Sequence, residues 1–176
     1  MPTDRSIRWG VVGSGGIARR RTIPEGIMQA RDCTLAAVFD IDQRVNHEVA
    51  EQFGAAACES EQALLERADV DAVYIATPAD AHGKQVLAAA RAGKHVLCEK
   101  PLGMTVREAQ LLVDQCARAQ VKLAVDFMMR FGAQHRAAKE MIDAGRIGRM
   151  VLGRAQLSCW YPPLAGANRS GVKAVL

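Results

Sequence analysis

The chain has 176 residues, a length that suits one domain with an appended piece and leaves no room for a second full domain. Its 49% hydrophobic and 24% charged residues are typical of a globular protein, and no apolar run approaches the ~18 residues that cross a bilayer, which excludes a disordered or membrane-spanning chain. The net charge of +4 is modest and scattered, which argues against a nucleic-acid-binding surface.

The cysteines and the N-terminal segment indicate the compartment. Five cysteines are unevenly spaced without a C-x-x-C pair, which predicts reduced thiols rather than disulfides or a zinc site. The segment MPTDRSIRWG has no apolar signal core, so we expect no export and a cytoplasmic protein. No Cys, His and Asp cluster has metal-ligand spacing, so no metal is predicted.

The first predicted strand covers residues 7–12 and ends at a glycine turn that opens a helix. The turn consists of Gly13, Ser14, Gly15, Gly16, Ile17 and Ala18. This pattern is typical of a dinucleotide site, because Gly13 allows the sharp turn, Gly15 leaves room for a pyrophosphate and Ala18 keeps helix and strand close. The alternative is a glycine turn without a ligand. The basic run at 19–21 has two possible roles, to help hold phosphate or to form a solvated helix face, and we favour the solvated face.

The second predicted strand, 33–40, ends in Asp40, about twenty positions after the glycine turn. A carboxylate at that distance binds the adenosine ribose, and the alternative role is to cap the next helix. Because Asp42 is equally well placed as the cap, we interpret Asp40 as the ribose ligand. Its charge favours NAD over NADP, although Arg44, one helical turn on, can accept a 2′-phosphate.

Further short apolar runs alternate with helical stretches along the chain. They cover residues 55–60, 72–78, 95–101 and 122–127. This alternation predicts an α/β fold with a doubly wound parallel sheet, covered by helices on both faces. Since ligands bind such sheets at the carboxyl ends of the strands, we expect the chemistry there.

The ends of the predicted helices are also readable. Asp80 is a plausible N-cap, and Thr105 with Glu108 forms a capping box. Three glycines follow helical stretches where a left-handed residue is wanted: Gly54, Gly93 and Gly145. The helix after Thr105 is expected to bury one apolar face, formed by Val106, Ala109, Leu112, Val113 and Cys116.

Three strand-end residues are candidates for chemistry. Lys100 precedes a proline and can reach the crevice, where an ammonium can hydrogen-bond a reacting oxygen, stabilise charge or pass a proton; a surface Glu-Lys pair is the alternative. His82 is either a structural residue, which is the commoner role, or a cofactor contact. Arg130 faces the crevice or makes a surface ion pair.

After Gly145 the pattern changes. Residues 149–160, RMVLGRAQLSCW, alternate like a strand, and the tail that follows has turns but no continuing pattern. An unpaired strand at that position would expose an edge, which predicts self-association into a homo-oligomer.

The segments GSGGIA, FDID, AVYIATPADAH, GKHVLCEKP and VDFMMRF, in this order and spacing, resemble the Gfo/Idh/MocA oxidoreductase family. The resemblance runs from about residue 7 to about residue 160, and its most specific part is GKHVLCEKP. It implies a Rossmann domain that binds NAD or NADP. It also implies hydride exchange with a hydroxyl-bearing carbon of a sugar, polyol or related alcohol.

The resemblance also implies roles for individual residues. Gly13 to Ala18 would hold the pyrophosphate, and Asp40 the adenosine ribose. Lys100 would be catalytic and orient the substrate hydroxyl, and its peptide bond to the following proline would be cis. Arg130 would lie near nicotinamide or substrate. The remaining cofactor contacts implied are Ala76, Thr77, Pro78, His82 and Glu99, of which Glu99 flanks the nicotinamide together with Lys100.

The chain departs from the family after residue 160. Family members continue into a substrate-binding α/β domain, whereas here the tail reads ANRSGVKAVL. We therefore expect a dinucleotide-binding domain at 1–125, and at 126–176 a linker helix with the truncated start of a substrate domain, from truncation or a frame change near residue 167. The leading hypothesis is the cofactor half of an oxidoreductase; the alternative is a dinucleotide-binding module or fragment without turnover.

Overall fold

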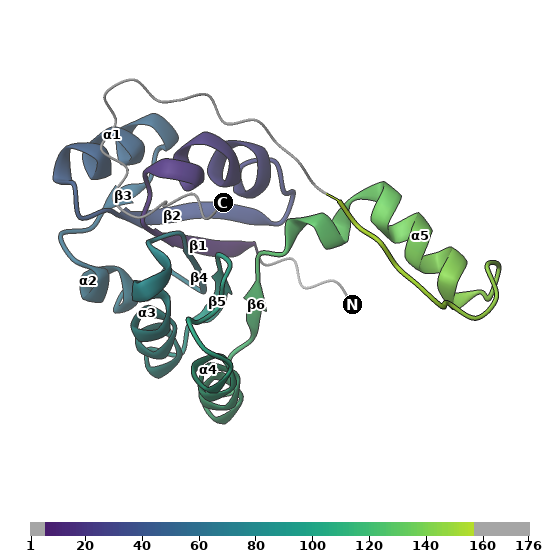
Figure 1. Cartoon of the computed structure of the whole chain (residues 1–176). Coiled ribbons are helices and arrows are strands. Elements are labelled where there is room, and N and C mark those ends of the chain that lie inside the picture. Colours follow the sequence, from purple (N-terminus) through teal and green to yellow (C-terminus); the bar gives the residue numbers. More distant parts are fainter. Residues whose placement is uncertain (1–5, 157–176) are drawn as a thin grey trace, which may run out of the picture. The chain divides into compact units, whose positions relative to one another are not determined.

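The computed structural model describes residues 6–156 and divides the chain into two compact units, one up to Met129 and one from Arg130. No helix in this part of the chain is long and apolar enough to cross a membrane. The elements are, in chain order, β1 (Ile7–Val12), η1 (Ala18–Ile27), β2 (Cys33–Phe39), α1 (Gln43–Phe53), β3 (Ala56–Ala57), α2 (Glu61–Leu65), β4 (Ala72–Ile75), α3 (Ala79–Arg91), β5 (His95–Cys98), α4 (Val106–Arg118), β6 (Leu123–Val125), η2 (Met128–Phe131) and α5 (Ala133–Asp143) (Figure 1).

The first unit is built on one parallel sheet with the strand order β3-β2-β1-β4-β5-β6. Every neighbouring pair is parallel, which confirms the predicted doubly wound α/β fold. The chain starts in the middle of the sheet, builds outward through β2 and β3, and then crosses back to β4. The strand order therefore reverses between β1 and β4, where sheets of this kind bind ligands.

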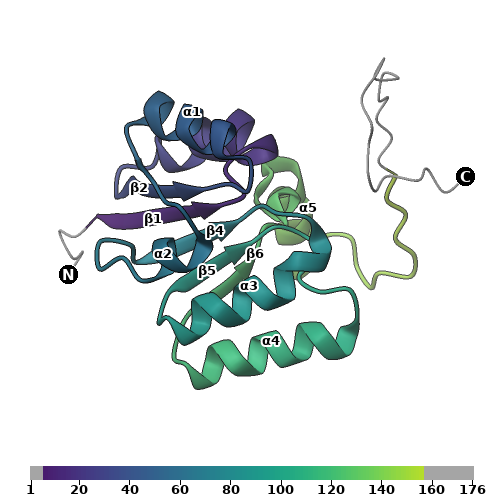
Figure 2. The same ribbon diagram turned by 90° about the vertical axis from the view of Figure 1, so that its left-hand side faces the viewer.

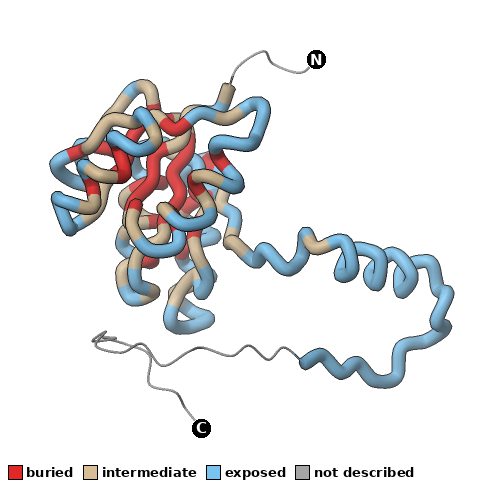
Figure 3. Tube along the Cα trace, turned by 90° about the horizontal axis from the view of Figure 1, so that it is seen from above, coloured by how far each residue is buried: buried red, intermediate tan, exposed pale blue. Residues whose placement is uncertain are grey.

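Helices cover both faces of this sheet (Figure 2). Because successive strand residues point to opposite faces, Val11 belongs to the core under η1 and α1, whereas Val12 belongs to the core under α2, α3 and α4. The same alternation places Tyr74 in the first core and Val73 in the second. The central strands are accordingly the most buried part of the fold (Figure 3).

Most of the predicted helix ends are confirmed. The Asp42 carboxylate accepts hydrogen bonds from the first turn of α1, and Thr105 accepts one from the Glu108 N–H. Three glycines adopt positive φ angles at helix ends: Gly54, Gly93 and Gly145, at 69°, 71° and 67°. The capping box is modified, because the Glu108 carboxylate accepts the N–H of Met104 at 2.7 Å rather than that of the cap residue.

Two sequence predictions about local structure are wrong. Helix α3 begins after Pro78, so Asp80 lies in its first turn and does not cap it. Pro78 can start the helix two residues earlier because its carbonyl accepts the Ala81 N–H at 2.9 Å. Within 149–156, the part of the predicted 149–160 strand that the structure describes, no strand forms. The edge from which self-association was predicted is therefore not built there.

Helices η1 and α4 each differ from expectation in one feature. Segment η1 is a π-helix, in which the Met28 N–H donates to the Ile23 carbonyl five residues earlier, and it contains Pro24, which has no N–H to donate. In α4, Leu112 and Cys116 are buried, whereas Val106 is 88% exposed. The sequence pattern of α4 therefore predicted too wide an apolar face.

Three buried cysteines lead to a testable difference in thiol reactivity. Burial raises the pKa of Cys58, Cys98 and Cys116, that of Cys98 to about 12. Because a thiolate is the reactive form, we expect these thiols to react with Ellman's reagent at pH 8 at least ~100-fold more slowly than half-buried Cys33. A Cys159→Ser background restricts the measurement to the described part of the chain. Equally fast reaction of all four thiols in the native protein would contradict this assignment.

The same shift affects alkaline stability. Since the folded state raises the pKa of Cys98 above its ordinary 9.0, the folded protein holds this proton more tightly than the unfolded chain. The resulting contribution to stability is present below pH 9 and lost as pH rises toward about 12. A Cys98→Ala variant is therefore expected to lose less stability than the parent over that interval.

Candidate cofactor site

Backbone hydrogen bonds connect the loops that follow neighbouring strands. These loops lie together along the carboxyl ends of the strands, which we call the carboxyl edge of the sheet. The N–H groups of Gly13 and Ala76 donate to the carbonyls that end β2 and β1, at 2.8 and 2.9 Å. The N–H groups of Glu99 and Asp126 donate in the same way to the ends of β4 and β5, at 2.9 and 2.8 Å. The structure thus brings the predicted glycine turn, the 76–78 loop and the 99–101 loop side by side.

Gly13 makes the closest backbone approach at this edge. Its φ is +81°, and a Cβ atom built on it would lie 2.9 Å from both the carbonyl carbon and the oxygen of Ala76. A side chain here would push the loop after β4 away from the loop after β1. The predicted role of Gly13 in turning the chain is confirmed, and the structure adds this second role.

The Asp40 carboxylate holds the glycine turn from the other side. One oxygen accepts the Gly15 N–H at 2.9 Å, and the other accepts the Asp42 N–H at 3.0 Å. A Cβ on Gly15 would lie 3.2 Å from this carboxylate and 3.1 Å from Cγ1 of Val45. Each carboxylate oxygen retains a free lone pair, so Asp40 can still accept a ribose hydroxyl.

The residues of the turn fit a dinucleotide. Gly16 has φ +48° and nothing within 4 Å of the position of a Cβ, which leaves open space above the start of the helix. The buried Ser14 hydroxyl has no hydrogen-bond partner within residues 6–156. Ala18 is fully buried in the core between η1 and the sheet, as predicted, and Ile17 is partly exposed. Open space, unused donors and a helix N-terminus together suit a pyrophosphate.

Arg44 lies on the first turn of α1 and is bound by a carboxylate that the sequence did not indicate. Its guanidinium contacts Glu48 at 2.7 Å, and Arg19 of η1 contacts the other oxygen of Glu48 at 2.8 Å. The hydrogen bond from Arg19, together with the charge of Arg44, lowers the pKa of the Glu48 carboxyl. The solvated face predicted for the basic run is therefore in part an ion-paired one.

His82, on helix α3, contacts two of the strand-end loops. It is 1% exposed, and its two ring nitrogens lie 2.7 Å from the Pro101 carbonyl oxygen and 2.9 Å from that of Thr77. Both nitrogens are thus occupied by backbone, and the ring connects the loop after β4 to the loop after β5. The Thr77 hydroxyl in turn donates to the side-chain oxygen of Gln85, and Pro78 is exposed at the rim.

Glu99 is fixed by a residue that the sequence analysis did not single out. The hydroxyl of Tyr74 donates to the Glu99 carboxylate at 2.9 Å and accepts from the Thr22 hydroxyl at 3.0 Å. Burial, with a smaller effect of the Glu99 charge, raises the pKa of Tyr74, so this hydroxyl stays protonated and serves as a donor. The sequence signal that could have identified Tyr74 is the presence of a polar hydroxyl inside the apolar run AVYIA.

Lys100 follows Glu99 and is exposed. Its ammonium makes no hydrogen bond or ion pair with any residue between 6 and 156, and the Lys100-Pro101 peptide bond is cis, as predicted. Asp126, at the end of β6, is a second acid of this edge that sequence reasoning missed. Burial first, and then the Glu99 charge, raise the pKa of the Asp126 carboxyl.

Arg130 begins the second compact unit and is exposed in that unit. Its predicted contact with nicotinamide or substrate stays a prediction.

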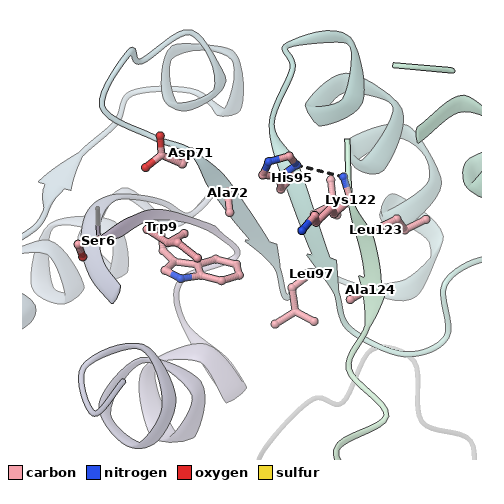
Figure 4. A pocket seen from close by; sticks show the side chains of 11 residues that line it. Ser6, Trp9, Asp71, Ala72, His95, Leu97, Lys122, Leu123 and Ala124 are labelled. Carbon is pink, nitrogen blue, oxygen red and sulfur yellow. Dashed lines mark hydrogen bonds between the residues drawn. The ribbon is translucent and has the colours of Figure 1, made fainter. Parts of the chain in front are cut away.

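A separate concavity of about 890 Å³ opens on the sheet face at the other ends of the strands (Figure 4). Its floor is apolar, with Trp9 and Leu97, and the Lys122 N–H donates to Nδ1 of His95 at 3.0 Å on its rim. None of the predicted site residues lines it.

Comparison with known proteins identifies the family. The sequence model of GFO_IDH_MocA, an oxidoreductase family with an NAD-binding Rossmann fold, matches residues 7–127. The chain belongs to the Gfo/Idh/MocA oxidoreductase family. The matched region of this Gfo/Idh/MocA chain contains every predicted site residue except Arg130.

Curated relatives in the family act on sugars and polyols. The chain is 38% identical to 1,5-anhydro-D-fructose reductase of Ensifer adhaerens over 157 residues, which are 89% of this chain and 46% of the relative. It is 31% identical to myo-inositol 2-dehydrogenase of Thermotoga maritima over 144 residues, 81% of this chain and 42% of the relative. The chain thus spans just under half the length of these relatives.

Solved structures show the same fold and coverage. The NADP complex of KijD10, a 3-ketoreductase from Actinomadura kijaniata, matches with a TM-score of 0.75 and 38% identity, over 82% of this chain and 46% of that one. Apo scyllo-inositol dehydrogenase from Lactobacillus casei matches with a TM-score of 0.74 and 29% identity, over 83% of this chain and 44% of that one. These likenesses confirm the predicted family and fold class.

Proposed function

We propose that this chain binds NAD or NADP at the carboxyl edge of its sheet and is the cofactor-binding part of an oxidoreductase. The reaction transfers a hydride between nicotinamide and a CH-OH carbon of a sugar, polyol or related alcohol. The observation that carries the proposal is the joining of the glycine turn, Asp40 and the Glu99-Lys100 loop at one edge. A cytoplasmic location is part of the same proposal.

In this proposal, different residues of the edge bind different parts of the cofactor. The glycine turn at residues 13–18 holds the pyrophosphate through the N–H groups that start the helix, because those of Gly13 and Gly15 already donate to Phe39 and Asp40. Asp40 accepts a hydroxyl of the adenosine ribose. Ala76, Thr77 and Pro78 form the wall beside the nicotinamide half. His82 keeps that wall in place through its contact with the Thr77 carbonyl.

Lys100 carries the proton in this proposal, while the nicotinamide, when bound, supplies or accepts the hydride. In the direction of carbonyl reduction, the Lys100 ammonium donates a proton to the oxygen as hydride adds to the carbon. In alcohol oxidation, the neutral amine takes the hydroxyl proton as hydride leaves. Glu99, held by Tyr74, fixes the start of this loop through the Lys100 N–H at 3.2 Å.

The substrate class rests on the relatives, whose names include a reductase of 1,5-anhydro-D-fructose and a dehydrogenase of myo-inositol. A sugar or polyol hydroxyl is therefore the proposed partner of Lys100. Residues 126–176 are proposed as a linker helix and the start of a substrate domain, since the chain spans just under half the length of these relatives.

Cofactor binding is tested by calorimetric titration with NADH. The parent chain is compared with a Gly15→Asp and a Gly26→Asp variant. Gly15→Asp places a Cβ atom 3.2 Å from the Asp40 carboxylate and adds a second negative charge beside it, on the pyrophosphate path, so we expect affinity to fall at least ~100-fold. Gly26→Asp adds the same charge to η1 where a Cβ meets nothing within 4 Å, and should bind NADH like the parent. Unchanged affinity in Gly15→Asp would refute the assigned pyrophosphate site.

Turnover is tested on a panel of sugars and polyols with NAD and NADP. Activity that falls roughly 10²–10⁴-fold in Lys100→Ala, at unchanged NADH affinity, would support the proton-transfer role. NADH binding without turnover on the whole panel would favour the alternative, a dinucleotide-binding module.

A further inference from the structure

The ion-pair bridge of Arg19, Glu48 and Arg44 (hereafter the 19-48-44 bridge) joins the two helices beside the proposed ribose site. Glu48 accepts the Arg19 guanidinium on one oxygen, at 2.8 Å, and that of Arg44 on the other, at 2.7 Å. Gln52, one turn further along α1, holds Nε of Arg19 at 3.0 Å. Both cations are therefore engaged by the same helix.

The bridge lies next to Asp40. Helix α1 begins immediately after Asp42, its cap, and Arg44 is the second residue of the helix. The neighbouring residue, Val45, lies 3.1 Å from the Cβ position of Gly15, which places the first turn of α1 against the glycine turn. A 2′-phosphate on a ribose bound by Asp40 would meet this turn of α1.

The two cofactors differ in the group on the 2′ carbon of the adenosine ribose. NAD carries a neutral 2′-hydroxyl, which a carboxylate accepts, whereas NADP carries a 2′-phosphate of nearly two negative charges, which needs arginine partners. In this chain the nearest arginine on α1 is already paired with Glu48. A phosphate must displace the Glu48 carboxylate from Arg44 and tolerate its charge close by.

We propose that Glu48 is a specificity-determining residue that disfavours NADP by occupying Arg44 and Arg19. The inference rests on the proposed function, because it assumes that the adenosine ribose lies at Asp40. In this arrangement Asp40 accepts the hydroxyl of NAD, and Glu48 withholds the cations that NADP would use. Removing the Glu48 charge while keeping its shape should release both arginines toward a phosphate.

The expected effect is moderate because the bridge is solvent-accessible. The Arg44 side chain is 75% exposed, and exposed ion pairs are individually weak. Freeing both guanidinium groups and removing one carboxylate near a phosphate is therefore expected to improve NADPH affinity about threefold to tenfold at low salt. The gain should shrink at high salt, since the charges are screened.

The experiment measures dissociation constants of NADH and NADPH for the full chain and for Glu48→Gln. We expect the NADPH constant to fall about threefold to tenfold while the NADH constant changes less than about twofold. Glu25→Gln is the matched control, because Glu25 makes the same kind of exposed pair, with Arg21 of η1 at 2.6 Å. It should leave both constants unchanged.

A third variant, Glu48→Gln with Arg44→Ala, shows whether Arg44 receives the phosphate, since the gain in NADPH affinity should then disappear. The inference is overturned if both cofactors gain equally, which would mean unspecific attraction, or if Glu48→Gln behaves like Glu25→Gln. NADH binding that persists in these cases would leave the proposed function standing. Binding of neither cofactor by the parent chain would overturn both.

Discussion

Gly13→Ala is expected to weaken NADH binding by at least ~100-fold and to lower the free energy of unfolding by about 2–4 kcal/mol. The backbone of Gly13 has φ +81°, which an alanine adopts at a cost of about 1–2 kcal/mol. The added Cβ would also lie 2.9 Å from the carbonyl carbon and oxygen of Ala76. Backbone cannot rotate away as a flexible side chain can, so the loop after β4 must move.

That movement links stability to binding. The same backbone shift displaces Thr77 and Pro78, the proposed wall of the cofactor site, from the glycine turn. Calorimetric titration with NADH measures the loss of binding, and urea unfolding measures the loss of stability. The binding loss should exceed what the fraction of unfolded protein explains, because the native site itself is altered.

Gly93→Ala separates strain from collision. Gly93 has φ +71° at the end of α3, and a Cβ there meets nothing within 4 Å. This variant should lose about 1–2 kcal/mol of stability from the left-handed backbone and keep the NADH affinity of the parent. If Gly13→Ala and Gly93→Ala change NADH affinity and the free energy of unfolding alike, the close approach of Gly13 to Ala76 does not contribute to cofactor binding.

His82→Leu is expected to cost about 2–4 kcal/mol of stability and to loosen the loop that carries Lys100. Leucine fills the buried space but leaves the carbonyls of Thr77 and Pro101 without the ring that now contacts both, at 2.9 and 2.7 Å. A neutral imidazole has a single N–H, so at least one of these contacts is a hydrogen bond, and both are when the ring carries two protons. The released carbonyls must find water or stay unsatisfied.

Two measurements test this role of His82. Urea unfolding gives the loss of stability, and amide hydrogen exchange of residues 99–104 shows whether the Lys100 loop opens more often than the rest of the sheet. His82→Gln keeps one side-chain donor and should recover part of both effects. His47→Leu, on the exposed face of α1, should change stability by less than about 0.5 kcal/mol.

The outcome that would contradict this role is specific. If His82→Leu loses stability but exchange in 99–104 rises no more than in the other loops, His82 is only a core residue. If exchange rises there and His82→Gln reverses it, the ring positions the Lys100 loop. NADH affinity should follow the exchange result, because the Thr77 wall moves with the same contact.

The sequence of this chain was sufficient for its periodic features. Short apolar runs with caps such as Asp42 and a left-handed Gly54 predicted the elements, because hydrophobic periodicity and helix capping act over a few neighbouring residues. The prediction of Asp80 as a cap failed because a local pattern could not choose between two suitable residues. Pro78 also suits a helix start, and only the carbonyl of Pro78 meeting the Ala81 N–H decided between them.

In the candidate site, the sequence indicated the residues themselves but not the contacts that hold them. A glycine turn, an acid about twenty positions later and the sequence Glu99-Lys100-Pro101 were visible as types and spacings. Their neighbours were not, because Tyr74 contacts Glu99 from another strand and Glu48 joins Arg19 to Arg44 across two helices. Such contacts depend on which strands become adjacent, and no local pattern records that.

By itself, then, the sequence determined the alternation of strands and helices and the chemical groups at the strand ends, since both follow from short-range periodicity and residue type. The tertiary structure decided which of those groups meet. It placed Ala76 against Gly13, joined His82 to the Pro101 carbonyl and paired Arg19 with Glu48. These contacts join residues far apart in the chain, and parallel pairing of β1 with β2 and β4 is what brings the strand-end loops to one edge.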